Sequence, residues 1–308
     1  MIKLTSKKIH MPVPCVLAVG KFESIHIGHR ALISEMKRLA HDSQQPGLAC
    51  ALVVFVPHPY TVLFDPEYRP LFTGSEREHL VQGLGVDYLL EYPFDRDFAM
   101  LSPEDFSHML FKELQTQVVV VGAGYRFGHK RVGTVDTLRQ IAGLYGAEVH
   151  VVAPRALKDD APKISTSIIR ELLSANMLPE AEDLLGYPFF ISGEVTPGRQ
   201  LGRTIGFPTI NMYPPAEKFL LSDGVYVTST IIGTCRYKSI TNIGLRPTIE
   251  SSEVSRSVET HLLDYEGSDL YGKQVRVEFL RFIRPEKRFD SLGELKTQIL
   301  EDCRSAML

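Results

Sequence analysis

Two stretches of the sequence combine glycines with side chains that act on phosphate groups. The first, Gly20–His29, reads GKFESIHIGH and follows an apolar segment. A glycine turn lets the backbone approach a phosphate, and a helix that begins after it presents free N–H groups. His26 and His29 are three residues apart, so both can face one anion and stabilise charge on a phosphoryl group during transfer. The pattern is typical of nucleotidyl transfer.

Two other interpretations of these histidines stay open. Both side chains can lie at the solvated end of a helix without any further role. Both can also bind a metal ion, although no carboxylate or cysteine stands nearby at the spacing of a ligand set.

The second stretch, Gly198–Asn211, reads GRQLGRTIGFPTIN and spaces its glycines four residues apart. Backbone amides in such a loop can wrap a phosphate. Thr209 and Asn211 are alternate residues, so both project to one side of an extended segment, where their oxygens suit Mg2+. Arg203 can offset phosphate charge. The glycines alone, however, also fit a hairpin of a β-barrel.

A single carboxylate stands among apolar neighbours in the segment Ser257–Asp264. Glu259 is placed to accept the proton of a substrate hydroxyl that attacks a γ-phosphate. The other interpretation of Glu259 is an ion pair at the edge of a sheet. His261 shares its face and either orients it or packs inside a barrel.

The first 150 or so residues alternate apolar strands with amphipathic helices, which predicts an α/β doubly wound fold. The expected strands are continuous apolar runs, as in a parallel sheet covered on both faces: Val16–Val19, Ala49–Phe55 and Val118–Val121. A helix should begin after Ser102, which is followed by proline and two acidic residues.

The pattern changes after Leu185 to short β-type segments broken by glycine and proline, which predicts a small antiparallel β-barrel. The expected strands are Phe189–Val195, Gly224–Thr230, Tyr237–Ile243, Val258–Leu263 and Val275–Phe282. A final helix, capped by Ser291, closes the chain. We therefore expect two domains, 1–186 and 187–308, that meet near Gly186.

The composition is that of an ordinary globular protein with 308 residues and a net charge of -3, which disfavours a dedicated nucleic-acid binder. Four separated cysteines form no CxxC pair and indicate free thiols in a reducing cytoplasm. No apolar run is long enough to span a membrane, and the N-terminus lacks the apolar core of a secretion signal. Self-association is left open.

Taken together, the chain resembles the bifunctional prokaryotic riboflavin kinase/FMN adenylyltransferase (FAD synthetase) family. In the C-terminal half the resemblance is carried by segments in family order: Gly202–Asn211, Gly224–Tyr226, Asn242–Gly244 with Arg246–Thr248, Ser257–Asp264, Asp269–Gly272 and Arg284–Glu286 with Phe289. In the N-terminal half it is carried by Gly20–His29, Phe55–Pro59, Leu84–Asp87, Phe94–Pro103, Gly122–Gly133 and Ile164–Arg170.

The resemblance implies a nucleotidylyltransferase-like α/β domain followed by a β-barrel kinase domain. It implies that riboflavin and Mg2+-ATP give FMN, and that FMN and ATP give FAD. Glu259 would be the kinase base, and Thr209 and Asn211 would hold Mg-ATP. His26 and His29 would act on ATP phosphates. The resemblance adds further ATP- and phosphate-binding residues: Gly20, Phe22, Gly28, Ser165, Thr166, Arg170, Gly202, Arg203, Gly206 and Pro208.

The sequence departs from the family pattern mainly in the N-terminal half. The departing residues are Glu23 and Ser24 for Asp-Gly, Val56 for aspartate, Ala123 and Gly124 for polar residues, Ile168 for arginine and, in the kinase half, Ile210 for alanine. Lost polar groups should weaken binding by about 1.5–3 kcal/mol each. Two alternatives to the bifunctional enzyme follow: a kinase whose N-terminal domain is weak or inactive, and a flavin-binding regulator without turnover.

Overall fold

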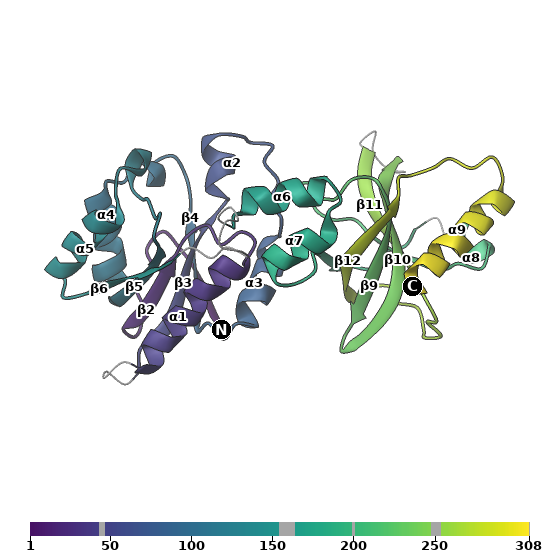
Figure 1. Cartoon of the computed structure of the whole chain (residues 1–308). Coiled ribbons are helices and arrows are strands. Elements are labelled where there is room, and N and C mark those ends of the chain that lie inside the picture. The colour runs from purple at the N-terminus through teal and green to yellow at the C-terminus, as the bar shows by residue number, and fades with distance from the viewer. Residues whose placement is uncertain (43–46, 154–163, 199–200, 248–253, 308) are drawn as a thin grey trace. The chain divides into compact units, whose positions relative to one another are not determined.

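The computed structural model describes residues 1–42, 47–153, 164–198, 201–247 and 254–307. The chain divides into two compact units, Met1–Thr166 and Ser167–Leu308 (Figure 1). Arg199 and Gln200 of the glycine-rich stretch, and Thr248 of a family segment, lie outside the described residues.

Unit 1 is built on a six-stranded sheet in the order β1-β4-β3-β2-β5-β6, and every neighbouring pair is parallel. Its strands are β1 (Ile2–Thr5), β2 (Cys15–Val19), β3 (Ala49–Val56), β4 (Tyr88–Pro93), β5 (Thr116–Gly122) and β6 (Glu148–Val152). All of β2 is buried, as expected for a strand covered on both faces. The doubly wound α/β prediction is confirmed, and the three strands expected from apolar runs are β2, β3 and β5.

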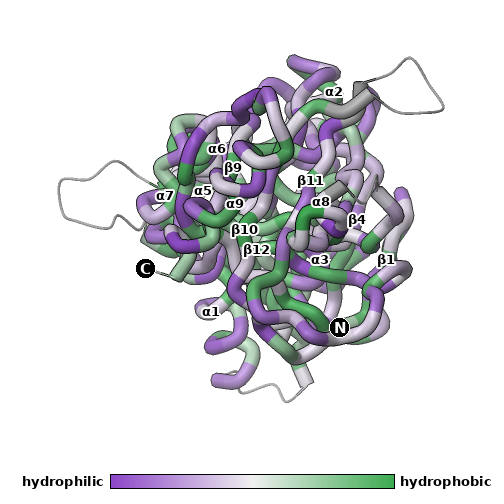
Figure 2. Tube along the Cα trace, turned by 90° about the vertical axis from the view of Figure 1, so that its right-hand side faces the viewer, coloured by the Kyte–Doolittle hydropathy of each residue, from purple (hydrophilic) through white to green (hydrophobic). Residues whose placement is uncertain are grey.

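The helices of unit 1 are α1 (Ile27–Asp42), α2 (Pro59–Leu63), α3 (Gly74–Gln82), η1 (Phe98–Met100), α4 (Pro103–His108), the π-helix η2 (Met109–Glu113), η3 (His129–Arg131) and α5 (Val135–Leu144). Hydrophobic and hydrophilic stretches alternate along α1, which buries Ile33 and Met36 (Figure 2). Ser102 caps α4 by accepting a hydrogen bond from the Asp105 amide at 3.0 Å, as predicted.

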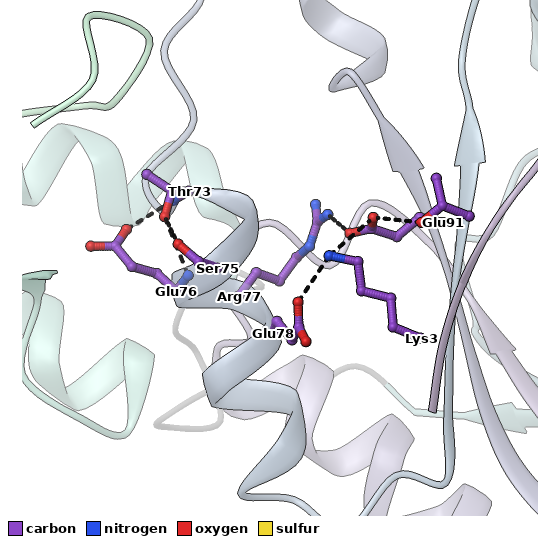
Figure 3. A network of polar contacts seen from close by, with 8 residues as sticks. Lys3, Thr73, Ser75, Glu76, Arg77, Glu78 and Glu91 are labelled. Atoms are coloured by element: carbon purple, nitrogen blue, oxygen red, sulfur yellow. Dashed lines mark hydrogen bonds and ion pairs between the residues drawn. The ribbon is translucent and has the colours of Figure 1, made fainter. Parts of the chain in front are cut away.

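A buried ion pair joins α3 to the sheet. The Arg77 guanidinium donates to Glu91 of β4 at 3.0 Å, and Glu91 also accepts from the Thr5 hydroxyl of β1 at 3.2 Å. Lys3 lies between Glu78 and Glu91, 2.9 and 3.5 Å from their carboxylates (Figure 3). This network fixes the edge strand β1, which sequence reasoning did not anticipate.

Unit 2 contains a six-stranded antiparallel sheet in the order β7-β12-β9-β10-β11-β8. Its strands are β7 (Phe190–Glu194), β8 (Thr209–Met212), β9 (Gly224–Ile232), β10 (Cys235–Pro247), β11 (Val254–Leu262) and β12 (Gln274–Arg284). Thr196 forms an isolated antiparallel bridge with Asn211 of β8, which brings the two edges of the sheet together. The predicted barrel is therefore a curled antiparallel sheet whose two edges meet at one bridge.

A chain of buried hydroxyl groups crosses the interior of this sheet. Thr230, Ser239, Thr228, Thr241 and Thr260 follow one another, and consecutive oxygens are 2.8, 2.8, 2.8 and 2.9 Å apart. All five side chains are almost completely buried. The strands β9, β10 and β11 are thus held together by side chains as well as by their backbone ladder.

Four helices complete the chain: α6 (Thr166–Ser174), α7 (Leu178–Leu185), α8 (Leu201–Thr204) and α9 (Leu292–Met307). Helix α7 packs against β12, and the Tyr226 hydroxyl of β9 donates to Asn176 at 2.9 Å. The compact unit starts at Ser167, 20 residues before residue 187, where the change in sequence pattern placed the start of the second domain. Ser291 caps α9 through the Glu294 amide, as predicted.

Candidate active sites

The loop between β2 and α1 brings the two histidines face to face. The rings of His26 and His29 stack with centroids 3.7 Å apart, and the His29 amide donates to His26 Nδ1 at 3.2 Å. A Cβ added at Gly28 would lie 3.0 Å from the His26 ring, and one at Gly20 would lie 3.2 Å from the Phe22 ring. The predicted group of five residues is therefore assembled at the carboxyl end of β2.

The environment of His29 keeps its imidazole neutral at pH 7. Burial, together with the positive charge that His26 can carry, lowers the pKa of His29 well below its ordinary value. Its Nδ1 is buried and has no hydrogen-bond partner among the described residues. A neutral imidazole has one N–H donor and one acceptor. It can bind a phosphate oxygen through a hydrogen bond without bringing a full charge.

The two departures from the family that follow Phe22 both have buried polar contacts. The Glu23 carboxylate accepts from the Tyr68 hydroxyl at 2.8 Å and from the Leu71 amide at 2.9 Å. The Ser24 hydroxyl lies 3.0 Å from the hydroxyl of Thr166. These side chains attach the histidine loop to two other segments of unit 1.

The start of α6 carries the remaining residues predicted for the N-terminal site. Ser165 and Thr166 are half-buried, and Thr166 meets the histidine loop through Ser24. Arg170 falls within unit 2, where its guanidinium lies 4.9 Å from the centre of the Phe219 ring. Ile168 is half-buried.

A cavity of about 490 Å³ lies beside the histidine loop. Aromatic side chains dominate its wall: Phe55, Tyr60, Phe64, Phe94, Phe98, Phe106, Tyr125 and Phe127. Four basic residues also line it: Lys21, Arg126, Lys130 and Arg131. Burial and the nearby Arg131 lower the pKa of Lys21. A flat aromatic ring system with an attached anion fits this chemistry.

Of the further departures, Gly124 lines this cavity directly, in the turn that follows β5. Val56 ends β3 and keeps 38% of its surface exposed. Neither residue supplies a polar side chain to the wall.

A second cavity, of about 260 Å³, lies within unit 2 and is lined by some of the predicted kinase residues but not by Asn211, Arg203, Gly206 or Pro208. Gly202, Thr209, Glu259 and His261 line it. In the sheet register, Glu259 of β11 faces Asn211 of β8 and His261 faces Thr209. The β8–β11 ladder therefore aligns the predicted base with the predicted metal ligands, because alternate residues share a face.

Asn211 has the features of a cation ligand. The residue is 4% exposed, and its Oδ1 has no hydrogen-bond partner among the described residues. Buried polar oxygens are rarely left without partners in native structures. No group of three or more histidine, cysteine or acidic residues that could hold a metal occurs in the described part of the chain. A hydroxyl and an amide oxygen instead suit a hard ion that arrives with a phosphate ligand.

The glycine-rich loop closes over the end of β8. A Cβ at Gly202 would collide with the Phe207 carbonyl, and Gly206 has a φ of +90°, which favours glycine. The Pro208 carbonyl lies 2.8 Å from His261 Nδ1, so this loop orients the histidine ring. Arg203 forms an exposed ion pair with Asp269 at 2.7 Å.

The family models match the chain in two consecutive parts: FAD synthetase over residues 8–168 and riboflavin kinase over residues 185–308. The bifunctional riboflavin kinase/FMN adenylyltransferase of Escherichia coli K12 is 37% identical over 292 residues, which cover 94% of this chain and 90% of that protein. The protein of the same name from Bacillus subtilis strain 168 is 33% identical over 296 residues, with coverage of 95% and 91%. This chain belongs to that family.

A solved structure described as a macrolide-efflux protein from Streptococcus pneumoniae has the same fold as this member of the riboflavin kinase/FMN adenylyltransferase family. The TM-score is 0.86 at 29% identity, and the match covers 100% of this chain and 99% of the other. Among the residues described here, no helix is long and apolar enough to cross a membrane.

In this family member, sequence reasoning did not name several residues of the cavity walls as site residues. In unit 2 the cavity is also lined by Asn242, Arg284 and Asp302. The Arg284 guanidinium donates to Asp302 of α9 at 3.0 and 2.7 Å, which ties the last helix to β12. The signal was present in part, because Arg284 belongs to a family segment, whereas Asp302 lies on an amphipathic helix without a motif.

Proposed function

We propose that the two units carry out successive steps of flavin cofactor synthesis. Unit 2 phosphorylates riboflavin with ATP to give FMN, and unit 1 transfers AMP from ATP to FMN to give FAD and pyrophosphate. The observation that carries the kinase assignment is that Glu259 pairs with Asn211 across β11 and β8, while Glu259 and Thr209 line one cavity. The stacked histidines beside an aromatic cavity carry the second assignment.

In the kinase step Glu259 acts as the general base. It accepts the proton of the ribityl 5'-hydroxyl as that oxygen attacks the γ-phosphorus of ATP, and ADP leaves. His261 stands two residues along the same strand and faces Thr209, so it helps to hold the end of β8 in place. The main contribution of the protein is to position the two substrates in line.

Thr209 and Asn211 would hold Mg2+ together with the phosphates of ATP. The buried Oδ1 of Asn211 supports this assignment. The ion would neutralise part of the negative charge on the phosphates. Gly202, Arg203, Gly206 and Pro208 form the phosphate loop beside it, in which backbone amides supply donors.

In the adenylyl transfer step an oxygen of the FMN phosphate attacks the α-phosphorus of ATP. His26 and His29 hydrogen-bond to the phosphate oxygens, with Gly20, Phe22 and Gly28 shaping the loop around them. Ser165 and Thr166 supply hydroxyl donors, and Arg170 a charge. The aromatic cavity takes the flavin ring, and the basic residues that line it would bind the FMN phosphate.

The departures from the family pattern favour a working unit 1. Glu23 and Ser24 both make buried hydrogen bonds, so the histidine loop is anchored despite its altered residues. This observation argues against the alternative in which unit 1 is an inactive scaffold. In the described sheet, Glu259 of β11 also pairs with Asn211 of β8. A regulator that lacks turnover would have no obvious use for this pair. We place both reactions in the cytoplasm, where the free thiols stay reduced.

The test is to incubate the purified chain with Mg2+-ATP and either riboflavin or FMN, and to separate the flavins by chromatography. We expect FMN from riboflavin and FAD from FMN. The incubation is repeated with oxidised and with reduced flavin. FMN without FAD under both conditions would restrict the function to the kinase, and neither product would overturn the proposal.

A further inference from the structure

We propose that Glu23 is a positioning residue for FMN in the adenylyl transfer step. Through its carboxylate it holds one wall of the aromatic cavity against the histidine loop. This inference rests on the proposed FMN adenylyltransferase activity and adds a residue that sets the affinity for FMN. The loop that carries Glu23 also carries Lys21, which lines the cavity, and His26, which stacks on His29.

Three contacts of Glu23 lead to one segment of the chain. One carboxylate oxygen accepts from the Leu71 amide at 2.9 Å. The other accepts from the Tyr68 hydroxyl at 2.8 Å and lies 3.4 Å from His58 Nε2. Glu23 and His58 are 4% and 8% exposed, so these contacts are shielded from water. Hydrogen bonds to a buried carboxylate are among the stronger ones in proteins.

The segment between these contacts forms a wall of the cavity. His58 caps α2, because its Nδ1 accepts from the Tyr60 amide at 3.2 Å. Helix α2 then presents Tyr60 and Leu63 to the cavity, and Phe64 follows them. The ring of Tyr68 stacks on His58 and contacts Tyr60, with centroids 5.0 and 4.8 Å apart. Glu23 therefore anchors both ends of the wall, at His58 and at Leu71.

The wall needs such an anchor because several of its side chains are largely exposed. Phe64 is 72% exposed, Leu63 43% and Tyr60 40%, although all three line the cavity. A short helix of five residues has little stability of its own. Without the carboxylate, α2 can move away from the cavity, and a flavin ring would have to order it again on binding.

The decisive experiment compares wild type with Glu23→Ala in FAD formation from FMN. Loss of a charge-assisted contact to the wall should raise the KM for FMN about tenfold. The KM for ATP should change less than twofold, and so should kcat. Riboflavin phosphorylation by unit 2 of the same chains measures the amount of intact protein and should be unchanged.

A matched control is Glu91→Ala. Glu91 is also a buried carboxylate of unit 1, bonded to Arg77 and Thr5, and it does not line the cavity (Figure 3). We expect it to lower the thermal unfolding temperature at least as much as Glu23→Ala and to leave the KM for FMN unchanged. Glu23→Gln keeps the length and one acceptor oxygen, and it should restore most of the affinity for FMN.

Tyr68→Phe tests the same link without removing the carboxylate. It should raise the KM for FMN about threefold. Added to Glu23→Ala, it should raise the KM little beyond that of Glu23→Ala alone, because both changes remove the hydrogen bond between Tyr68 and Glu23. If Glu23→Ala does not fold, the KM for FMN of Tyr68→Phe tests the inference by itself. An unchanged KM for FMN in both variants, or an equal rise in Glu91→Ala, would overturn the inference.

A wild-type chain that makes FMN but no FAD would remove the adenylyl transfer step from the proposed function instead. Calorimetric titration with FMN then tests the inference separately. The expected result is that Glu23→Ala weakens one of two FMN sites and leaves the kinase site unchanged. Equal affinities in both proteins would contradict the role of Glu23.

Discussion

Glu259 combines a half-buried carboxylate with a place in the kinase cavity. Replacing it with glutamine keeps the shape of the side chain but removes the proton acceptor. We expect Glu259→Gln to slow FMN formation from riboflavin by about 10²–10⁴-fold, while FAD formation from added FMN continues. Chromatography of both reactions checks this. Undiminished FMN formation would remove Glu259 from the mechanism.

His29 should make unit 1 sensitive to acid. Its pKa in the folded chain lies well below the 6.5 of an unperturbed histidine. Below pH 6.5 the unfolded chain therefore binds a proton that the folded chain does not, and the stability of unit 1 falls with the pH. Calorimetry between pH 7.5 and 5.5 should show a steeper loss of thermal stability for wild type than for His29→Gln. Parallel curves for the two proteins would contradict this.

At the scale of single residues, the sequence was most informative where chemistry demands a motif. His26, Thr209 and Glu259 could be proposed as site residues because backbone approach, alternation along a strand and an isolated carboxylate each leave a local pattern. The aromatic cavity could not be found in that way. Its residues come from separate segments, such as Phe55 at the end of β3 and Tyr125 after β5, and only the fold brings them together.

At the scale of elements, α9 depends on one ion pair. Asp302 is buried, and its carboxylate holds Arg284 of β12 through two hydrogen bonds. Removing it leaves a mostly buried guanidinium without its partner, which costs about 3 kcal/mol. Leu295 and Ile299 of α9 line the kinase cavity, so its wall should loosen as well.

We therefore expect Asp302→Ala to lower the midpoint of denaturant unfolding of unit 2 and to raise the KM for riboflavin several-fold. The control is Lys7→Ala, which breaks an exposed pair with Asp95 and should change neither quantity. An Asp302→Ala protein with wild-type stability would show that packing alone holds α9.

The elements that the sequence predicted are those with a strong local signal in their residues. The apolar strands β2, β3 and β5 and the capped helices α4 and α9 were all visible, because burial on both faces and helix caps are local properties. The strands β1, β4 and β6 of unit 1 and the short strand β8 of unit 2 were not assigned. The four residues of β8 lie close to a glycine-rich loop, and their strand character comes from pairing with β11. The π-helix η2 has no local signal that distinguishes it from α4.

At the scale of the whole molecule, the position of the boundary can be tested by expression. Helix α7 buries Leu178 and Leu185, which contribute about 3–6 kcal/mol. A chain of residues 167–308 should therefore phosphorylate riboflavin and unfold at a clearly higher temperature than a chain of residues 187–308. Equal unfolding temperatures would support the boundary at Gly186 that the sequence pattern suggests.

The row of hydroxyl groups inside unit 2 has a consequence for its hydrogen atoms. Five hydroxyls carry five hydrogens, but the four contacts between Thr230 and Thr260 use only four. One hydroxyl must therefore act only as an acceptor within the row, and its own hydrogen must point outside the row. Any of the five can take that place, and rotations about C–O bonds exchange them without moving a carbon or an oxygen. The kinase interior thus admits five proton arrangements within a single heavy-atom structure, a degeneracy that neutron diffraction would reveal as shared deuterium occupancy.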